Sequence, residues 1–198
     1  MAVSYPIALK LDSRRSVVVG GGPEALERAR ALLRSGARVT VVTGPAPAAL
    51  AELEALAGVE LVTRDFASSD LDGVWLVVLA DRDEAVAERI RVEAEARRIF
   101  FCAVDMPLFS SFSYLAIARA GLAFAAIGTE GEAPALARRL REILEALFAR
   151  AGLEGFTQKL AELRQRTPSE RRREVLGSAV AGVRIEGELV LPPPTDER

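Results

Sequence analysis

The sequence predicts an α/β fold: a doubly wound parallel sheet, followed by a β-hairpin with a long helix and then a small helical domain. Three observations lead to this prediction. Short valine-rich runs alternate with segments of helical period over residues 16–104. The run 74–80 is apolar at nearly every position, as in a strand buried on both faces. Beyond residue 112 this alternation ends, and two apolar segments joined by Arg119-Ala120-Gly121 indicate a hairpin.

The first strand–helix–strand unit is complete within residues 16–42. The β-branched run 17–19 predicts a strand, and a helix is expected from Pro23 to about Ser35. Proline suits the first helical turn, because its missing N–H would have no partner within the helix there. The helix carries apolar residues at three-and-four spacing, which must face a sheet. The next strand is expected at 38–42, which closes a βαβ unit.

The turn between that strand and helix carries the pattern Gly20-x-Gly22-x-x-Ala25. In the dinucleotide fingerprint the first glycine permits the tight turn, the second lets the backbone approach a pyrophosphate, and the third position keeps the helix close to the strand. The free N–H groups and the dipole of the helix start favour the anionic diphosphate. Because a strand precedes the motif and a helix follows it, we predict a Rossmann-type dinucleotide site rather than a purely structural glycine turn.

The second strand lacks the carboxylate that usually holds the adenosine ribose hydroxyls in this fold. It ends in Val41-Val42-Thr43-Gly44-Pro45, where Thr43 and the backbone of Gly44 could reach a ribose. No arginine cluster follows to indicate the 2′-phosphate of NADP. The choice between NAD and NADP therefore stays open on physical grounds.

The composition excludes several classes of function. The chain has 198 residues, a net charge of −2, one cysteine and no histidine. This charge gives no case for nucleic-acid binding, no apolar run is long enough to cross a membrane, and the start has no signal-peptide pattern. Without histidine, proton transfer falls to a carboxylate, a lysine, a tyrosine or the substrate itself. We expect a cytoplasmic protein without a thiolate metal cage.

Three aspartates directly follow predicted strands, at the sheet edge where ligands bind in such folds. Asp81 and Asp83 begin a helix, where carboxylates also complement the helix dipole. Asp105 follows the strand 99–104, and its alternative role is that of a turn or cap residue before a proline. Cys102, inside that strand, is expected to be a small buried hydrophobe.

We predict four parts in the chain. These are a dinucleotide-binding domain over 1–112, a dimerisation region over 113–150, a helical domain over 151–183 and a flexible tail over 184–198. The dimerisation region is inferred because a hairpin and a leucine-striped helix lie beyond a finished sheet and leave an apolar face. We therefore expect a homodimer.

Several stretches of this sequence occur together in one known family. They are Tyr5-Pro6-Ile7, Val18-Val19-Gly20-Gly21-Gly22, Leu32-Leu33-x-x-Gly36-Ala37-Arg38-Val39-Thr40-Val41, Arg98-Ile99-Phe100, Val104-Asp105 and the helix start Pro134-Ala135-Leu136-Ala137-Arg138. The chain resembles the precorrin-2 dehydrogenase / sirohydrochlorin ferrochelatase family, the amino-terminal module of siroheme synthase, over most of residues 5–150. The resemblance implies NAD-dependent oxidation of precorrin-2, a tetrapyrrole, to sirohydrochlorin. It also implies iron insertion as a second activity, with Fe²⁺ as a substrate.

The resemblance further implies which residues act. Asp105 matches the family's catalytic aspartate, and no protein metal site is implied. The family's NAD-contact positions fall on Pro23 and Glu24 after the glycines, and on Gly44 and Pro45 after the second strand. With the motif, the expected cofactor-binding residues are Gly20, Gly21, Gly22, Pro23, Glu24, Ala25, Thr43, Gly44, Pro45, Ala80 and Asp81.

The chain departs from the family at several positions. It has Ala80-Asp81-Arg82-Asp83 where the family has Ala-Thr-Asp-Asp, and Ala133 replaces a serine before the helix proline. Further departures lie at Ala87, Cys102 and Leu115. They leave open a non-catalytic dinucleotide- or tetrapyrrole-binding homologue that has lost the reaction. A third hypothesis is a different small-molecule oxidoreductase on the same scaffold.

Overall fold

The computed structural model describes residues 3–45 and 48–191. The chain divides into two compact units, Met1–Tyr114 and Leu115–Arg198. Of the expected flexible tail, residues 184–191 form no helix or strand, and residues 192–198 lie outside the described residues. Among the described helices, none is long and apolar enough to cross a membrane.

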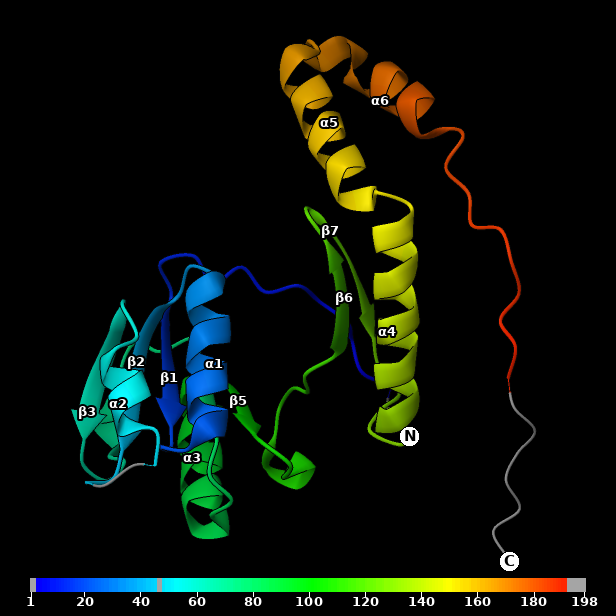
Figure 1. Cartoon of the computed structure of the whole chain (residues 1–198). Helices are drawn as coiled ribbons and strands as arrows, with labels where there is room; N and C mark the ends of the chain where they lie inside the picture. The colour runs from blue at the N-terminus through cyan, green and yellow to red at the C-terminus, as the bar shows by residue number, and fades with distance from the viewer. Residues whose placement is uncertain (1–2, 46–47, 192–198) are drawn as a thin grey trace, which may run out of the picture. The chain divides into compact units, whose positions relative to one another are not determined.

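The first unit is built on a five-stranded parallel sheet of order β3-β2-β1-β4-β5 (Figure 1). The strand order reverses at β1, because the chain first runs outward through β2 and β3 and then returns to the other side of β1. Val19 pairs with both Val42 and Leu79, so β1, β2 and β4 end level with one another. The predicted doubly wound sheet is confirmed. Its strands are β1 (Arg15–Val19), β2 (Arg38–Thr43), β3 (Val59–Thr63), β4 (Leu76–Leu79) and β5 (Phe100–Ala103).

Helices cover both faces of this sheet, because successive side chains of a strand point to opposite sides. Val18 is buried in one cluster with Ala25 of α1. Its neighbour Val17 is buried in a second cluster with Ile90 of α3. Both faces of the sheet are therefore buried, which explains the continuous valine runs of its strands. The helices are α1 (Pro23–Arg34), α2 (Leu50–Glu54) and α3 (Glu84–Arg97), with the short 3-10 turns η1 (Ser68–Leu71) and η2 (Pro107–Phe109).

The second unit combines the predicted hairpin with helices. Gly121 turns the chain between the two antiparallel strands at φ +56°, and a Cβ there would lie 3.0 Å from the side chain of Glu154. α4 packs on the hairpin and is followed by α5 and α6 (Figure 1). The elements are β6 (Ala116–Ala120), β7 (Ala123–Ile127), α4 (Pro134–Arg150), α5 (Leu153–Arg166), η3 (Ser169–Arg171) and α6 (Arg172–Val180).

Two segments of the first unit form little regular structure. Residues 5–11, an apolar run, form no strand. Within this run Tyr5 and Ile7 are exposed, and only Leu11 is buried. An apolar run becomes a strand only where the edge of a sheet pairs with it, and this run has no such partner within the described part of the first unit. In the alanine-rich segment after β2 the helix covers only Leu50–Glu54, and residues 46–47 lie outside the described residues.

Candidate functional site

The loops that carry the candidate residues start at one edge of the sheet. Backbone hydrogen bonds extend the ladder past the strands: the Gly20 N–H donates to Val42 O at 2.9 Å, and the Val104 N–H donates to Leu79 O at 2.9 Å. These bonds fix where the glycine turn and the loop after β5 begin. Both loops therefore lie at the carboxyl ends of the strands, where ligands bind in open α/β sheets.

The glycine turn 20–22 is shaped for the close approach of a ligand. Gly20 has φ +130°, and a Cβ on it would lie 2.8 Å from Asp81 Oδ1, so only glycine fits. Gly22 has an extended backbone, yet a Cβ on it would meet no atom of the described residues within 4 Å. This open space lies beside the first N–H groups of α1, whose N-cap makes no side-chain hydrogen bond. Because such N–H groups favour an anion, the turn fits a diphosphate.

Asp81 brings a negative charge to this turn. Burial raises the pKa of Asp81 above its usual value and the charge of Asp83 adds to this, although the Gly21 N–H opposes it by donating a hydrogen bond to the carboxylate. Asp83 itself caps α3 by accepting a hydrogen bond from the Val86 N–H at 3.0 Å. The carboxylate of Asp81 therefore already binds one N–H of the glycine turn, that of Gly21.

A pocket of about 350 Å³ adjoins the glycine turn, and we call it the β2–β3 pocket. Its walls come from Gly20, from Thr43 and Gly44 at the end of β2, and from residues 64–66 beyond β3. Asp81 closes it on the side of β4. The pocket thus extends from the glycine turn across the ends of β2 and β3. The remaining lining residues are Val19, Val42, Leu79, Asp83, Val86 and Arg89.

Residues 64–66 were missed by the sequence analysis. Arg64 donates two hydrogen bonds to Asp70, at 2.8 and 2.6 Å, and Asp70 is only 7% exposed. Arg89 lies over the Phe66 ring, 5.7 Å from its centroid. Asp65 is exposed, and its carboxylate makes no hydrogen bond or ion pair within the described part of the chain. No local sequence signal marks these residues, because their place beside the end of β2 depends on the order of the strands in the sheet.

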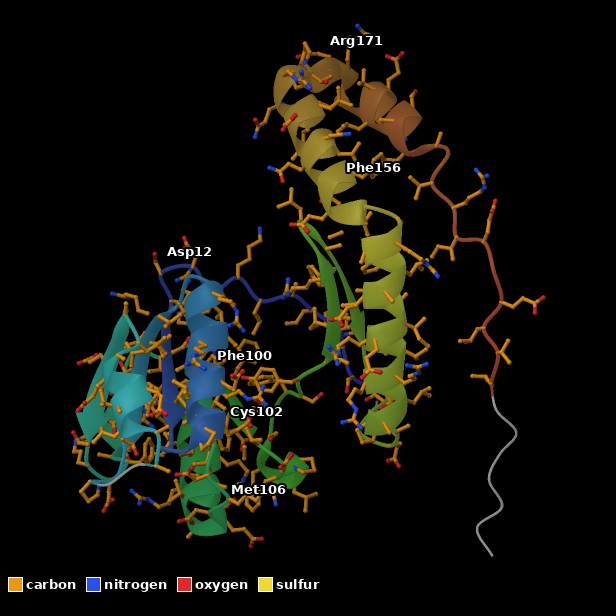
Figure 2. All side chains as sticks on the ribbon, viewed as in Figure 1. Asp12, Phe100, Cys102, Met106, Phe156 and Arg171 are labelled. Carbon is orange, nitrogen blue, oxygen red and sulfur yellow. The ribbon has the colours of Figure 1, made fainter. Side chains whose placement is uncertain are left out.

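A second pocket, of about 380 Å³, holds Asp105, and we call it the Asp105 pocket. It is lined by residues 102–107 at the end of β5, by Arg28 of α1 and by Tyr114. Asp105 adopts a left-handed backbone conformation (φ +59°), which aspartate tolerates better than most residues. Its carboxylate pairs with Arg82 in the loop after β4, and both side chains stay exposed. Cys102 and Met106, which are labelled in Figure 2, also line this pocket.

Asp105 is the group of this pocket best suited to accept a proton. Burial raises the pKa of the Cys102 thiol above its usual value and raises the pKa of Tyr114 to about 12, so both stay protonated at neutral pH. Arg28 donates to Glu24 at 2.6 Å and lies over the Tyr114 ring, 4.1 Å from its centroid. An exposed carboxylate is the remaining acid–base group among these residues. Cys102 is buried, as expected.

The expected catalytic residue and the expected cofactor-binding residues line different pockets. Asp105 lines the Asp105 pocket, whereas four of the expected cofactor-binding residues line the β2–β3 pocket. Among the described residues, no three His, Cys, Asp or Glu side chains are grouped to hold a metal ion. The four residues in the β2–β3 pocket are Gly20, Thr43, Gly44 and Asp81. The expected residues that line neither pocket are Gly21, Gly22, Pro23, Glu24, Ala25, Pro45 and Ala80.

Comparison with known proteins identifies the first unit. Residues 7–116 match a family of domains described as "Putative NAD(P)-binding". The chain belongs to this NAD(P)-binding family. The match begins before β1 and ends in β6, so it includes both the glycine turn and Asp105. The predicted dinucleotide cofactor is confirmed by this match.

The curated relatives of this NAD(P)-binding chain include siroheme synthases. Siroheme synthase 3 of Aeromonas hydrophila subsp. hydrophila is 39% identical over 173 residues, which are 85% of this chain and 37% of the relative. Siroheme synthase of Ectopseudomonas mendocina is 42% identical over 141 residues, 71% of this chain and 30% of the relative. The chain thus spans about a third of the length of these relatives.

A solved structure shares nearly the whole fold. SirC, precorrin-2 dehydrogenase, matches with a TM-score of 0.75 and 27% identity, over 89% of both chains. This match includes most of the second unit, which lies beyond the NAD(P)-binding family match. The resemblance to the precorrin-2 dehydrogenase family and the predicted α/β fold are both confirmed.

Proposed function

We propose that the chain is an NAD-dependent precorrin-2 dehydrogenase, which oxidises precorrin-2 to sirohydrochlorin in siroheme biosynthesis. The observation that carries this is an open glycine turn and a separate pocket with an exposed carboxylate at one edge of the sheet. Similarity to SirC over 89% of both chains supports a tetrapyrrole substrate. The glycine turn suits the cofactor, and the Asp105 pocket suits the reacting part of the substrate.

The residues of the first unit fit NAD. The space over Gly22 and the N–H groups at the start of α1 suit its diphosphate, because a side chain at Gly22 would fill that space. Thr43 and Gly44 line the neighbouring pocket that would take the adenosine half. When bound, NAD supplies the acceptor for a hydride from the substrate. We propose that the remaining expected residues, apart from the carboxylate of Asp81, contribute backbone contacts and packing around it.

Asp105 is the proposed proton acceptor. Oxidation of the macrocycle releases a proton, and a positioned carboxylate can take it up. The ion pair with Arg82 holds the carboxylate of Asp105, and Asp105 lines its pocket. Arg82 also places positive charge beside a substrate that carries carboxylates. Iron insertion, the second activity that the resemblance implies, needs a base beside the macrocycle as well, and Asp105 would serve there with Fe²⁺ as substrate.

A homodimer is part of the proposal. The second unit exposes large apolar side chains: Leu122 at 71%, Phe124 at 50% and Leu136 at 45%. Exposed apolar surface of this kind marks a site of association. We propose that residues 113–150 form the interface between two copies of the chain.

Turnover tests the proposal. In the absence of oxygen, the purified protein with NAD and precorrin-2 should form NADH and sirohydrochlorin in equal amounts, followed by absorbance. Binding of NAD without any turnover would favour the non-catalytic homologue, and no binding of NAD would overturn the cofactor assignment. Adding Fe²⁺ to the same reaction and measuring siroheme tests the second activity.

A further inference from the structure

The carboxylate missing at the end of β2 has a substitute on the neighbouring strand. Thr43 of β2 pairs with Thr63 of β3, so the residues that follow Thr63 leave the sheet at the same edge as Gly44. Asp65 comes two positions after Thr63 and lines the β2–β3 pocket together with Thr43 and Gly44. An aspartate that follows β3 therefore lines this pocket, although β2 itself carries no carboxylate.

Asp65 is available for a ligand. Its side chain is exposed and makes no hydrogen bond or ion pair within the described part of the chain. Its backbone is nevertheless fixed, because Arg64 Nη1 donates to Asp65 O at 3.0 Å while the same guanidinium is held by Asp70. A free carboxylate on a fixed backbone, in a pocket beside a glycine turn, can accept hydrogen bonds from a ligand without first losing a partner.

The two arginines of the pocket, Arg64 and Arg89, already interact with other residues of the chain. Arg64 could not turn toward a ligand phosphate without leaving the buried Asp70 carboxylate without its cationic partner, which is costly. Arg89 is stacked on Phe66 and donates to its backbone oxygen at 3.4 Å. The other charged lining residues, Asp81 and Asp83, are acidic. A phosphate in this pocket would therefore face carboxylates, while both guanidinium groups already interact with other residues.

We propose that Asp65 binds the adenosine ribose hydroxyls of the dinucleotide and thereby selects NAD over NADP. A carboxylate accepts hydrogen bonds from the two vicinal hydroxyls and repels a 2′-phosphate. This inference rests on the proposed function, since it assumes that the adenosine half occupies the β2–β3 pocket. It assigns to the loop after β3 the role that the end of β2 usually has.

Calorimetric titration of the full chain with NAD and with NADP tests this assignment. The wild-type protein should bind NAD at least about tenfold more tightly than NADP. Asp65→Asn should weaken NAD binding by about tenfold, because the charge-assisted hydrogen bonds are lost, while NADP binding stays or improves. The ratio of the affinity for NAD to the affinity for NADP should thus fall to about one. Asp12→Asn is the matched control: it removes an exposed aspartate at the opposite end of the first unit, far from Met106 in Figure 2, and should leave both affinities unchanged.

Each alternative result has a definite meaning. Unchanged affinities in Asp65→Asn would overturn the assignment. An equal loss for NAD and NADP would also overturn it, because the carboxylate would then act on a group that the two dinucleotides share, such as the adenine amino group. If the wild-type protein bound neither dinucleotide, the proposed function would fail, and the inference with it. Circular dichroism confirms that the variants are folded.

Discussion

At the scale of single residues, Asp105 combines a strained backbone with an exposed carboxylate. Its φ of +59° lies in the left-handed region, which asparagine tolerates as well as aspartate does. Asp105→Asn should therefore keep the fold and the affinity for NAD, and it should lose proton uptake. We expect NADH formation from precorrin-2 to fall by about 10²–10⁴-fold, measured at saturating NAD.

A glycine at this position is the matched control, because Asp105→Gly removes the carboxylate and relieves the strained backbone together. Both variants should be inactive to a similar degree. If Asp105→Asn retained full turnover while binding NAD normally, Asp105 would be only a turn residue and the base would have to be sought elsewhere.

Asp81 should oppose the cofactor that the glycine turn attracts. Its carboxylate accepts a hydrogen bond from the Gly21 N–H, and its negative charge lies beside the turn that a diphosphate would approach. Because its pKa is raised, it takes up a proton more readily than an ordinary aspartate, and wild-type affinity for NAD should rise as the pH falls from neutral. Asp81→Asn should bind NAD more tightly at neutral pH and with less pH dependence. Titration calorimetry at several pH values measures both effects.

The comparison for this prediction is Asp83→Asn. It removes an equal charge two residues away, and asparagine still caps α3. Its effect on NAD affinity should be smaller than that of Asp81→Asn. Weaker NAD binding in Asp81→Asn would show instead that the carboxylate contributes to holding the cofactor.

At the scale of elements, the loop between β3 and β4 depends on one ion pair. Asp70 is buried, is bound twice by Arg64 and accepts a hydrogen bond from the Ala67 N–H at 2.8 Å. Asp70→Asn should lower the free energy of unfolding by about 1–3 kcal/mol, since it weakens a buried charge-assisted network. Urea unfolding followed by the fluorescence of the single tryptophan, Trp75, measures this.

This contribution depends on pH in a defined direction. Arg64 lowers the pKa of Asp70 below its value of 3.8 in an unfolded chain. The stabilisation is therefore present above about pH 4 and is lost as the pH falls through the lowered pKa. The difference between wild type and Asp70→Asn should shrink in that acidic range. Asp72→Asn, an exposed neighbour, should match wild type throughout, and an equal loss there would contradict the role of the ion pair.

The two outer glycines of the turn should respond differently to a side chain. Gly22 has φ −92° and open space around it, so Gly22→Val should fold and exclude the diphosphate. Gly20 has φ +130° and lies against Asp81, so Gly20→Val should destabilise the protein itself. Thermal unfolding and NAD titration separate the two effects. Normal NAD binding by Gly22→Val would contradict the placement of the diphosphate.

The sequence allowed the elements around the glycine turn to be predicted because their signals are local. Valine runs buried on both faces, a proline at the first helical position and the glycine spacing each depend on a few adjacent residues. The position of Asp105 past β5 was predictable for the same reason. Asp65 was not, because its relation to Thr43 depends on β3 lying next to β2, a contact between residues far apart in the sequence. The separation of Asp105 and the glycine turn into two pockets likewise depends on tertiary packing.

At the scale of the whole molecule, the question is how the apolar surface of the second unit is covered. On α4, Leu136 is 45% exposed and Ile143 is 41% exposed. They lie seven residues apart and thus on one face of the helix. Ala137, one position along, is buried, so the exposed apolar face differs from the face that packs within the unit. A second copy of the chain is the partner we propose for it.

Replacing Leu136 and Ile143 together by aspartate should therefore prevent association without unfolding the chain. Wild-type protein should have the mass of two chains by size-exclusion chromatography with light scattering, and the double variant the mass of one. Ala149→Asp is the control: it introduces a carboxylate at an exposed position on the opposite side of α4 and should remain dimeric. A wild-type mass of one chain at micromolar concentration would contradict the proposed interface. NAD binding should survive in the monomeric variant, because every residue assigned to the cofactor belongs to the first unit.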